Sequence, residues 1–341
     1  MRFSEVIGPH QVKTRLVTSV REGRVSHAQL FSGGEGGYGL SLALAYASYI
    51  LCLNKLEDDS CGACAACIKS DKLTLPDLHF SFPVVTTPQV KDKPKSSDFL
   101  SIWRETVLRN HYVALDEWYE SIGVETKQGF ISVEEAADII RKMSLRPFES
   151  ENKVLIIWLP EKMRDDAANK LLKLIEEPPY GTVFILVTED HEQLLPTILS
   201  RTQLVKLPVL DATQTSQILM QYAGSSQSQA VRIARIANGN LSLALSMVQD
   251  QEEEKTVSME HDFMYWMRIC YNPFLEKDGN FAWVELNNWI DEITKMGKEH
   301  LKRFLAFCLD ASRDCLLKNV GAGQISRFDD EFIPEIGRAH V

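Results

Sequence analysis

The sequence predicts an α/β domain built on a parallel sheet, followed by a region made only of helices. Two near-continuous apolar runs, residues 153–159 and 183–188, have the composition of strands buried on both faces of such a sheet. Stretches with helical spacing separate the predicted strands, and this alternation is typical of a parallel α/β sheet. After Pro208 the strand signal ends, and helical patterns alone continue.

The first 52 residues predict a helix, a strand, a loop and a second helix. Apolar residues recur at helical spacing between residues 12 and 20, and residues 27–31 are expected to form a short strand. A glycine-rich loop at residues 33–39 and an Ala/Leu-rich helix at residues 40–52 follow. Strand, glycine-rich loop and helix in this order are the arrangement of a phosphate-binding loop.

The later elements carry their own boundary signals. Ser132 and Glu135 form an S-x-x-E pattern that predicts a capping box and the start of a helix. An amphipathic helix at residues 165–175 is expected to end before Pro178, and residues 204–207 are a last strand candidate. Further helices are expected at residues 193–199, 211–223, 227–238, 240–250 and 258–320.

Length and composition limit the classes of protein that fit. A chain of 341 residues suits two or three domains, and 25% charged residues are typical of globular rather than disordered chains. The sequence has neither a long apolar stretch nor a signal-peptide pattern, so a cytoplasmic protein without a membrane span is expected. The net charge of −10 argues against DNA binding as the main independent activity, because DNA-binding proteins carry basic surfaces.

Four of the seven cysteines lie within 16 residues, at Cys52, Cys61, Cys64 and Cys67. Four thiolates at this spacing match the closed, tetrahedral site of a structural zinc ion. Reduced free thiols and a redox C-x-x-C pair are the alternatives, and the clustering of four cysteines favours zinc. An odd number of cysteines in a chain without an export signal does not suggest a disulfide framework.

Residues 84–130 are predicted to be an insertion that contains a helix. Its aromatic residues Trp103, Tyr112, Trp118 and Tyr119 have two interpretations. They could stack on nucleic-acid bases, or they could form a packed core between helices. We favour the core, because aromatic residues at helical spacing more often pack inside a protein.

Four motifs in order carry a family resemblance over the first 210 residues. These are FSEVIG at 3–8, HAQLFSGGEG at 27–36, KLLKLIEEPP at 170–179 and LSR at 199–201. Together they resemble the AAA+ subunits of bacterial DNA polymerase III clamp loaders, although Thr202 stands where that family usually has a cysteine. The resemblance implies a RecA-like AAA+ domain at 1–208 with a zinc module at 52–67, a helical lid domain at 209–256 and a helical collar domain at 257–335.

The phosphate loop lacks the residues that a working ATP site needs. Such a loop reads G-x-x-x-x-G-K-[ST], where the lysine reaches the phosphates and the hydroxyl holds Mg²⁺. In one register the last three positions are Tyr38, Gly39 and Leu40; in the other they are Gly39, Leu40 and Ser41. The degenerate loop therefore comprises Gly33, Gly36, Tyr38, Gly39 and Leu40, with no lysine in either register.

Two further parts of the ATP site are also missing. The strand at 153–159 ends without the expected pair of acids, and Glu161 beyond it is expected to be a solvated residue at a helix start. No arginine follows Gly239, where the family usually has a sensor arginine. We therefore expect no ATP hydrolysis and no ATP cofactor, a combination that resembles delta-prime subunits rather than motor subunits.

Arg201 is the candidate catalytic residue. AAA+ sites lie between subunits, and the resemblance implies that Arg201 serves the ATP of a neighbouring motor subunit as an arginine finger in trans, with Ser200 positioning it. The alternative is a surface arginine at a helix C-terminus, where a positive charge is favourable.

The resemblance implies a non-hydrolysing delta-prime, or stator, subunit of the polymerase holoenzyme. Its partners would be gamma/tau-type motor subunits and the delta subunit, with the sliding clamp and primed DNA contacted through the assembly and no membrane involved. Two alternatives stay open: an ATP-hydrolysing motor subunit with an atypical loop, and a zinc-bearing DNA-binding protein. Residues 336–341 (IGRAHV) match what a sequencing adapter encodes, so we expect this tail to be non-native and the collar to be truncated near residue 335.

Overall fold

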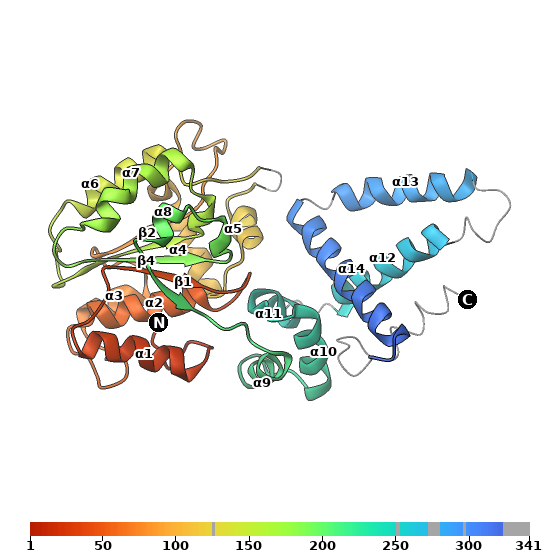
Figure 1. The fold of residues 1–341 in the computed structure, drawn as a ribbon, viewed down its shortest axis with the longest axis horizontal. Coiled ribbons are helices and arrows are strands. Elements are labelled where there is room, and N and C mark those ends of the chain that lie inside the picture. Colours follow the sequence, from red (N-terminus) through yellow and green to blue (C-terminus); the bar gives the residue numbers. More distant parts are fainter. Residues whose placement is uncertain (125–126, 250–252, 272–279, 296–297, 323–341) are drawn as a thin grey trace. The chain divides into compact units, whose positions relative to one another are not determined.

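The computed structural model describes residues 1–124, 127–249, 253–271, 280–295 and 298–322 (Figure 1). The chain divides into two compact units. The first comprises residues 1–210 together with 239–242, and the second comprises residues 211–238 and 243–341. None of the helices in the described part of the chain is long and apolar enough to cross a membrane.

The first unit is built on a five-stranded parallel sheet with the order β2-β3-β4-β1-β5. Its strands are β1 (Ala28–Ser32), β2 (Leu78–Ser81), β3 (Lys153–Trp158), β4 (Thr182–Thr188) and β5 (Gln203–Lys206). Every residue of β3 and β4 is buried, as their apolar sequences predict for inner strands of a parallel sheet. The edge strand β2 was not predicted from the sequence.

Helices cover both faces of this sheet, with α6 and α7 on one side and α1, α2 and α3 on the other (Figure 1). The main core packs α6 and α7 against side chains of β1, β3 and β4; it includes Leu155 of β3, Phe184 of β4 and Leu171 of α7. The helices and short 3-10 turns of the unit are α1 (His10–Arg21), α2 (Gly39–Leu51), α3 (Ala65–Asp71), η1 (Ser96–Phe99), α4 (Leu100–Arg109), α5 (Leu115–Ser121), α6 (Val133–Met143), η2 (Pro160–Lys162), α7 (Asp165–Glu176), η3 (His191–Gln193) and α8 (Pro196–Leu199).

The predicted capping box at the start of α6 forms only in part. The Ser132 side chain accepts a hydrogen bond from the Glu135 amide and caps the helix. The Glu135 carboxylate does not return to Ser132; it is buried and accepts a hydrogen bond of 2.8 Å from the Ser96 amide. Glu135 therefore ties the insertion to the sheet domain instead of completing the cap.

The insertion at residues 84–130 closes on itself and packs its aromatic residues inward. Val84 and Phe130 at its two ends form an antiparallel bridge. Trp103 and Trp118 are fully buried, and the Trp118 indole donates a hydrogen bond to the Pro83 carbonyl. The predicted aromatic core is confirmed, because buried rings are inaccessible for stacking on bases.

The second unit contains only helices among its described residues, as predicted. They are α9 (Ala212–Ala223), α10 (Gln227–Ala237), α11 (Leu241–Gln249), α12 (Glu253–Tyr271), α13 (Asn280–Lys295) and α14 (Lys298–Asn319). The predicted boundary between residues 256 and 257 falls inside α12. The tail at residues 336–341 lies outside the described residues.

Candidate functional site

The glycine-rich loop lies where the sequence predicts it, between β1 and α2. The Gly33 amide donates to the Thr188 carbonyl of β4, and Tyr38 is the residue before the first turn of α2. Gly36 has a φ of 61°, in the left-handed region that favours glycine. A side chain at this position would also meet Asn240, 2.0 Å from its Oδ1 atom.

Protein atoms fill the space beside this loop. Tyr38 is 3% exposed, and its hydroxyl donates a hydrogen bond of 3.0 Å to the Pro208 carbonyl. The cavity that remains between the loop and residues 207–210 has a volume of about 10 Å³. That is room for about one water molecule, whereas sites for small molecules measure roughly 300–1,000 Å³. This cavity beside the loop is therefore far smaller than a nucleotide.

The residues at the lysine and hydroxyl positions of the loop are buried in the protein. Leu40 is buried, so the position that would carry the lysine in one register is part of the core. Ser41, the candidate hydroxyl for Mg²⁺ in that register, is fully buried and donates a hydrogen bond of 2.5 Å to the His111 carbonyl. Neither register presents a magnesium ligand to the loop.

A carboxylate from the chain itself binds a backbone amide of the loop. The Gly36 N–H donates a hydrogen bond of 2.9 Å to Glu189 Oε1. In working phosphate loops such amides bind the phosphate oxygens of the nucleotide. The Glu189 carboxylate thus occupies this donor and adds a negative charge that would repel a phosphate. Glu189 was not predicted from the sequence, although it directly follows β4 at the carboxyl end of the sheet, where α/β proteins commonly bind ligands.

The predicted solvated position of Glu161 is wrong. Its Oε1 atom accepts a hydrogen bond of 3.0 Å from the Glu189 amide, and its Oε2 atom is buried. Burial raises the pKa of this carboxyl, and hydrogen bonds from the Glu161 and Glu189 amides offset only part of that effect. Glu161 therefore supports the segment that carries Glu189, and its side chain is not a freely hydrated one.

Replacing Glu161 by glutamine tests this support. A carboxyl whose pKa is raised on folding stabilises the protein below its unfolded pKa and loses that contribution as pH rises through the folded pKa. Glutamine keeps an oxygen for the Glu189 amide and removes the charge. We therefore expect Glu161→Gln to unfold in urea with a higher free energy than the wild type at pH 7, and to lose this advantage at acidic pH, where the wild-type carboxyl is also neutral. The exposed Glu192→Gln is the control, and a Glu161→Gln protein less stable at pH 7 would contradict the interpretation.

Arg201 lies between α8 and β5 and is held by three acceptors. Its Nε atom donates a hydrogen bond of 2.8 Å to Glu176 Oε2 at the end of α7, and its Nη1 atom donates to the Thr197 carbonyl at 3.1 Å. The contact to Ser200, the predicted positioning residue, is longer, at 3.5 Å from Nη1 to Oγ. The structure thus adds Glu176, which sequence analysis did not assign to this role.

The sheet places Arg201 away from the phosphate loop of its own chain. β1 and β5 are parallel neighbours, with Gln29 opposite Gln203 and Ser32 opposite Lys206. Arg201 precedes β5, whereas the phosphate loop follows β1. The two sites therefore lie at opposite ends of the sheet, separated by a strand of four residues, or about 13 Å.

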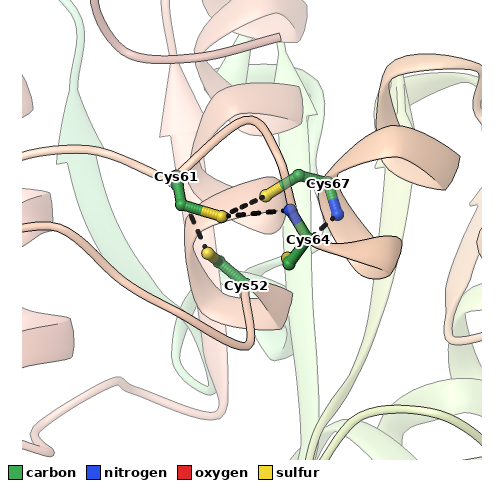
Figure 2. Close-up of side chains that lie close together, drawn as sticks. All are labelled: Cys52, Cys61, Cys64 and Cys67. Atoms are coloured by element: carbon green, nitrogen blue, oxygen red, sulfur yellow. Dashed lines mark hydrogen bonds between the residues drawn. The ribbon is translucent and has the colours of Figure 1, made fainter.

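The four predicted cysteines meet at one point (Figure 2). They come from the end of α2, the following loop and the start of α3, and their Sγ atoms all lie within 4.8 Å of one another. The Sγ atoms of Cys61 and Cys67 are 3.9 Å apart. Four sulfurs around a zinc ion at Zn–S distances of about 2.3 Å are separated by roughly 3.8 Å, so the cluster has the size of a tetrahedral metal site.

Backbone amides already point at these sulfurs. Cys61 Sγ accepts from the amides of Ala63 and Cys64, and Cys64 Sγ accepts from the amide of Cys67. Burial raises the pKa of the Cys64 thiol, but hydrogen bonds from the Cys67 and Leu53 amides outweigh it and bring the pKa to about 6. Burial raises the pKa of Cys52 and Cys67. A metal ion at the centre would supply the positive charge that four close thiolates need.

A family model described as "DNA polymerase III, delta subunit" matches residues 8–211. The chain belongs to this family of clamp-loader proteins. The predicted fold class, a parallel-sheet domain followed by helices, is confirmed.

This chain has curated relatives of two kinds, delta′ subunits and tau/gamma subunits. It is 28% identical to the DNA polymerase III subunit delta′ of Bacillus subtilis over 242 residues, which cover 71% of this chain and 60% of the relative. It is 22% identical to the delta′ subunit of Escherichia coli over 315 residues, covering 92% of this chain and 77% of the relative. Identity to subunit tau/gamma of Haemophilus influenzae is 27% over 250 residues, covering 72% of this chain.

The matched region spans 30% of that tau/gamma relative and 60% of the Bacillus subtilis delta′ relative. Because identity to delta′ and to tau/gamma subunits is similar, similarity alone does not distinguish between them. The geometry of the phosphate loop must carry that distinction.

Proposed function

We propose that this clamp-loader protein is the non-hydrolysing, delta-prime-type subunit of its assembly. The phosphate loop carries this proposal, because the Glu189 carboxylate binds the Gly36 amide, a donor that phosphates would need, and the Tyr38 side chain is buried against residues 207–210. A motor subunit with an atypical loop is the alternative. It is disfavoured because the loop lacks a lysine and a free magnesium ligand, and because its cavity measures about 10 Å³.

Arg201 gives the inactive subunit a catalytic role in its neighbour. A guanidinium at the end of the sheet opposite its own phosphate loop has no nucleotide to serve in its own chain. In the proposed assembly it reaches the ATP of the adjacent motor subunit and stabilises the charge of the transferring phosphoryl group, as arginine fingers do. Chemistry then takes place in the neighbour, and this chain supplies one group of the site.

Zinc is the metal that the four-cysteine cluster fits best. Four thiolates prefer a soft or borderline ion in tetrahedral geometry, and such closed sites are structural. The ion would hold the segment from Cys52 to Cys67 and would take no part in catalysis, because no ligand position is left open.

The helical part of the chain offers a surface for assembly. On α14 the residues Leu309 and Leu316 are 73% and 63% exposed; Leu305 lies on the same helix face, and Val320 directly follows the helix on that side. The opposite face of α14 packs Phe304 and Phe307 into a core. Exposed apolar stripes mark contacts with other proteins. We propose that this stripe lies in a collar at 257–335 formed with the other subunits, while residues 209–256 act as the lid.

Charge placed on this stripe is expected to weaken assembly. The double variant Leu309→Glu, Leu316→Glu should bind gamma/tau-type subunits at least about 10-fold more weakly, because two exposed apolar contacts become charged. Light scattering on the size-separated complex, together with titration, measures the change. Leu145→Glu, at a leucine that is 66% exposed in the first unit, is the control. Equal loss of binding in both variants would contradict a role for α14.

The proposed function also has a direct test on the chain alone. Calorimetry with MgATP should give no binding heat, and the purified chain should not turn over ATP. The same chain should join gamma/tau-type and delta subunits in a cytoplasmic complex that loads the sliding clamp onto primed DNA. Magnesium-dependent ATP turnover by the isolated chain, at one site per molecule, would contradict the proposal and favour the motor subunit.

A further inference from the structure

The sequence contains two adjacent acids, Glu176 and Glu177, at the end of α7, and only one of them contacts Arg201. Glu176 Oε2 lies 2.8 Å from Arg201 Nε across 25 residues of sequence. Glu177 follows the helix as its C-terminal cap, and the described residues show no contact between it and Arg201. The two acids share charge and exposure but differ in this one interaction.

The contacts of Arg201 leave one edge of its guanidinium unoccupied. Nε is bound by Glu176, and Nη1 is bound by the Thr197 carbonyl with a longer contact to Ser200 Oγ. Among the described residues, Nη2 has no hydrogen-bond partner. An arginine side chain has five N–H donors in one plane, so fixing Nε and Nη1 also fixes the direction of Nη2.

We propose that Glu176 is the positioning residue of the arginine finger. It would hold the guanidinium by Nε and so present Nη2 to a phosphate oxygen of the neighbouring subunit. This inference rests on the proposed role of Arg201. The two elements that carry this pair lie against each other, because α7 packs against α8 and the turn that carries Arg201 directly follows α8.

The energetics assign this contact to orientation rather than to folding. The side chains of Arg201 and Glu176 are 30% and 55% exposed, and exposed ion pairs add little to stability. An arginine side chain that is free to rotate, however, must be ordered each time the transition state forms. Complete loss of that order would slow the reaction by up to about 30-fold.

The test uses the complete complex, reconstituted from this chain and its gamma/tau-type and delta subunits, with single-turnover ATP hydrolysis as the readout. We expect Glu176→Ala to lower the rate constant at the affected site by about 5- to 30-fold, with the KM for ATP unchanged. Glu176→Gln should recover part of the rate, since its amide oxygen can accept from Nε. Glu177→Ala, which keeps the Glu176 contact, should behave like the wild type.

A double-mutant cycle separates this inference from the role of Arg201 itself. In an Arg201→Ala background, Glu176→Ala should cause no further loss, because there is no guanidinium left to orient. If Arg201→Ala slows the reaction but Glu176→Ala does not, Glu176 has no positioning role, while the proposed role of Arg201 is retained. If Arg201→Ala itself has no effect, the finger proposal fails first. A faster reaction in Glu176→Ala would mean that Glu176 holds the arginine back, which also overturns the inference.

Discussion

Replacing Arg201 by alanine in the reconstituted complex is expected to slow ATP hydrolysis at one motor site by about 10³-fold or more. The reason is the loss of a positive group that acts on the phosphoryl group only in the transition state. Binding of ATP should change little, so the KM stays near its wild-type value while the rate constant falls. Single-turnover ATP hydrolysis in a rapid-quench instrument measures the rate constant. The amplitude of the fast phase should fall by the contribution of one motor site.

Two further variants make the Arg201 experiment specific. Arg201→Lys keeps the charge but loses the planar fork of donors and should recover little activity. Arg15→Ala removes another exposed arginine, from α1, and should leave the rate unchanged. Assembly of each complex is checked by light scattering, so that a lost subunit is not mistaken for lost chemistry. A normal fast phase in a fully assembled Arg201→Ala complex would refute the finger.

The fold was predictable where the sequence pattern depends on local burial. The runs that became β3 and β4 are apolar at nearly every position, because both of their faces are covered. The edge strand β2 has only four residues and pairs with one neighbour, so its sequence carries no comparable run. The short helix α3 was missed for a related reason: it has only seven residues, and its sequence AACIKSD shows no apolar stripe.

The candidate site was predictable where it depends on residue identity, and not where it depends on tertiary contacts. The missing lysine and the four cysteines can be read directly from the sequence. The bond from Gly36 to Glu189 joins residues 153 positions apart, and the pair of Glu176 and Arg201 joins residues 25 apart. Residues so far apart in the sequence meet only in the folded protein. The hydrogen bond between the Glu189 carboxylate and the phosphate loop could therefore not be predicted from the sequence.

Loss of one cysteine from the metal cluster is expected to release the ion and loosen the whole segment that it holds. Cys64→Ser should reduce bound zinc from one equivalent to below about 0.1, because a hydroxyl is a poor replacement for a thiolate ligand. Elemental analysis of the purified protein measures the loss, and thermal unfolding should show a lower midpoint. Cys315→Ser, at a cysteine outside the cluster, is the control. A full equivalent of zinc in Cys64→Ser would contradict the four-cysteine site.

Loss of the metal ion should also loosen the N-terminal segment. Asp59 lies between the first two cysteines of the cluster, and its carboxylate accepts hydrogen bonds from the amides of Phe3 and Ser4 at 2.9 and 3.0 Å. If the metal orders this loop, its loss should raise hydrogen exchange at both amides. Asp59→Ala separates metal binding from the contact to the N-terminal segment. It should raise exchange at Phe3 and Ser4 while one equivalent of zinc stays bound. Unchanged exchange in Cys64→Ser would mean that the loop holds the N-terminal segment without help from the metal.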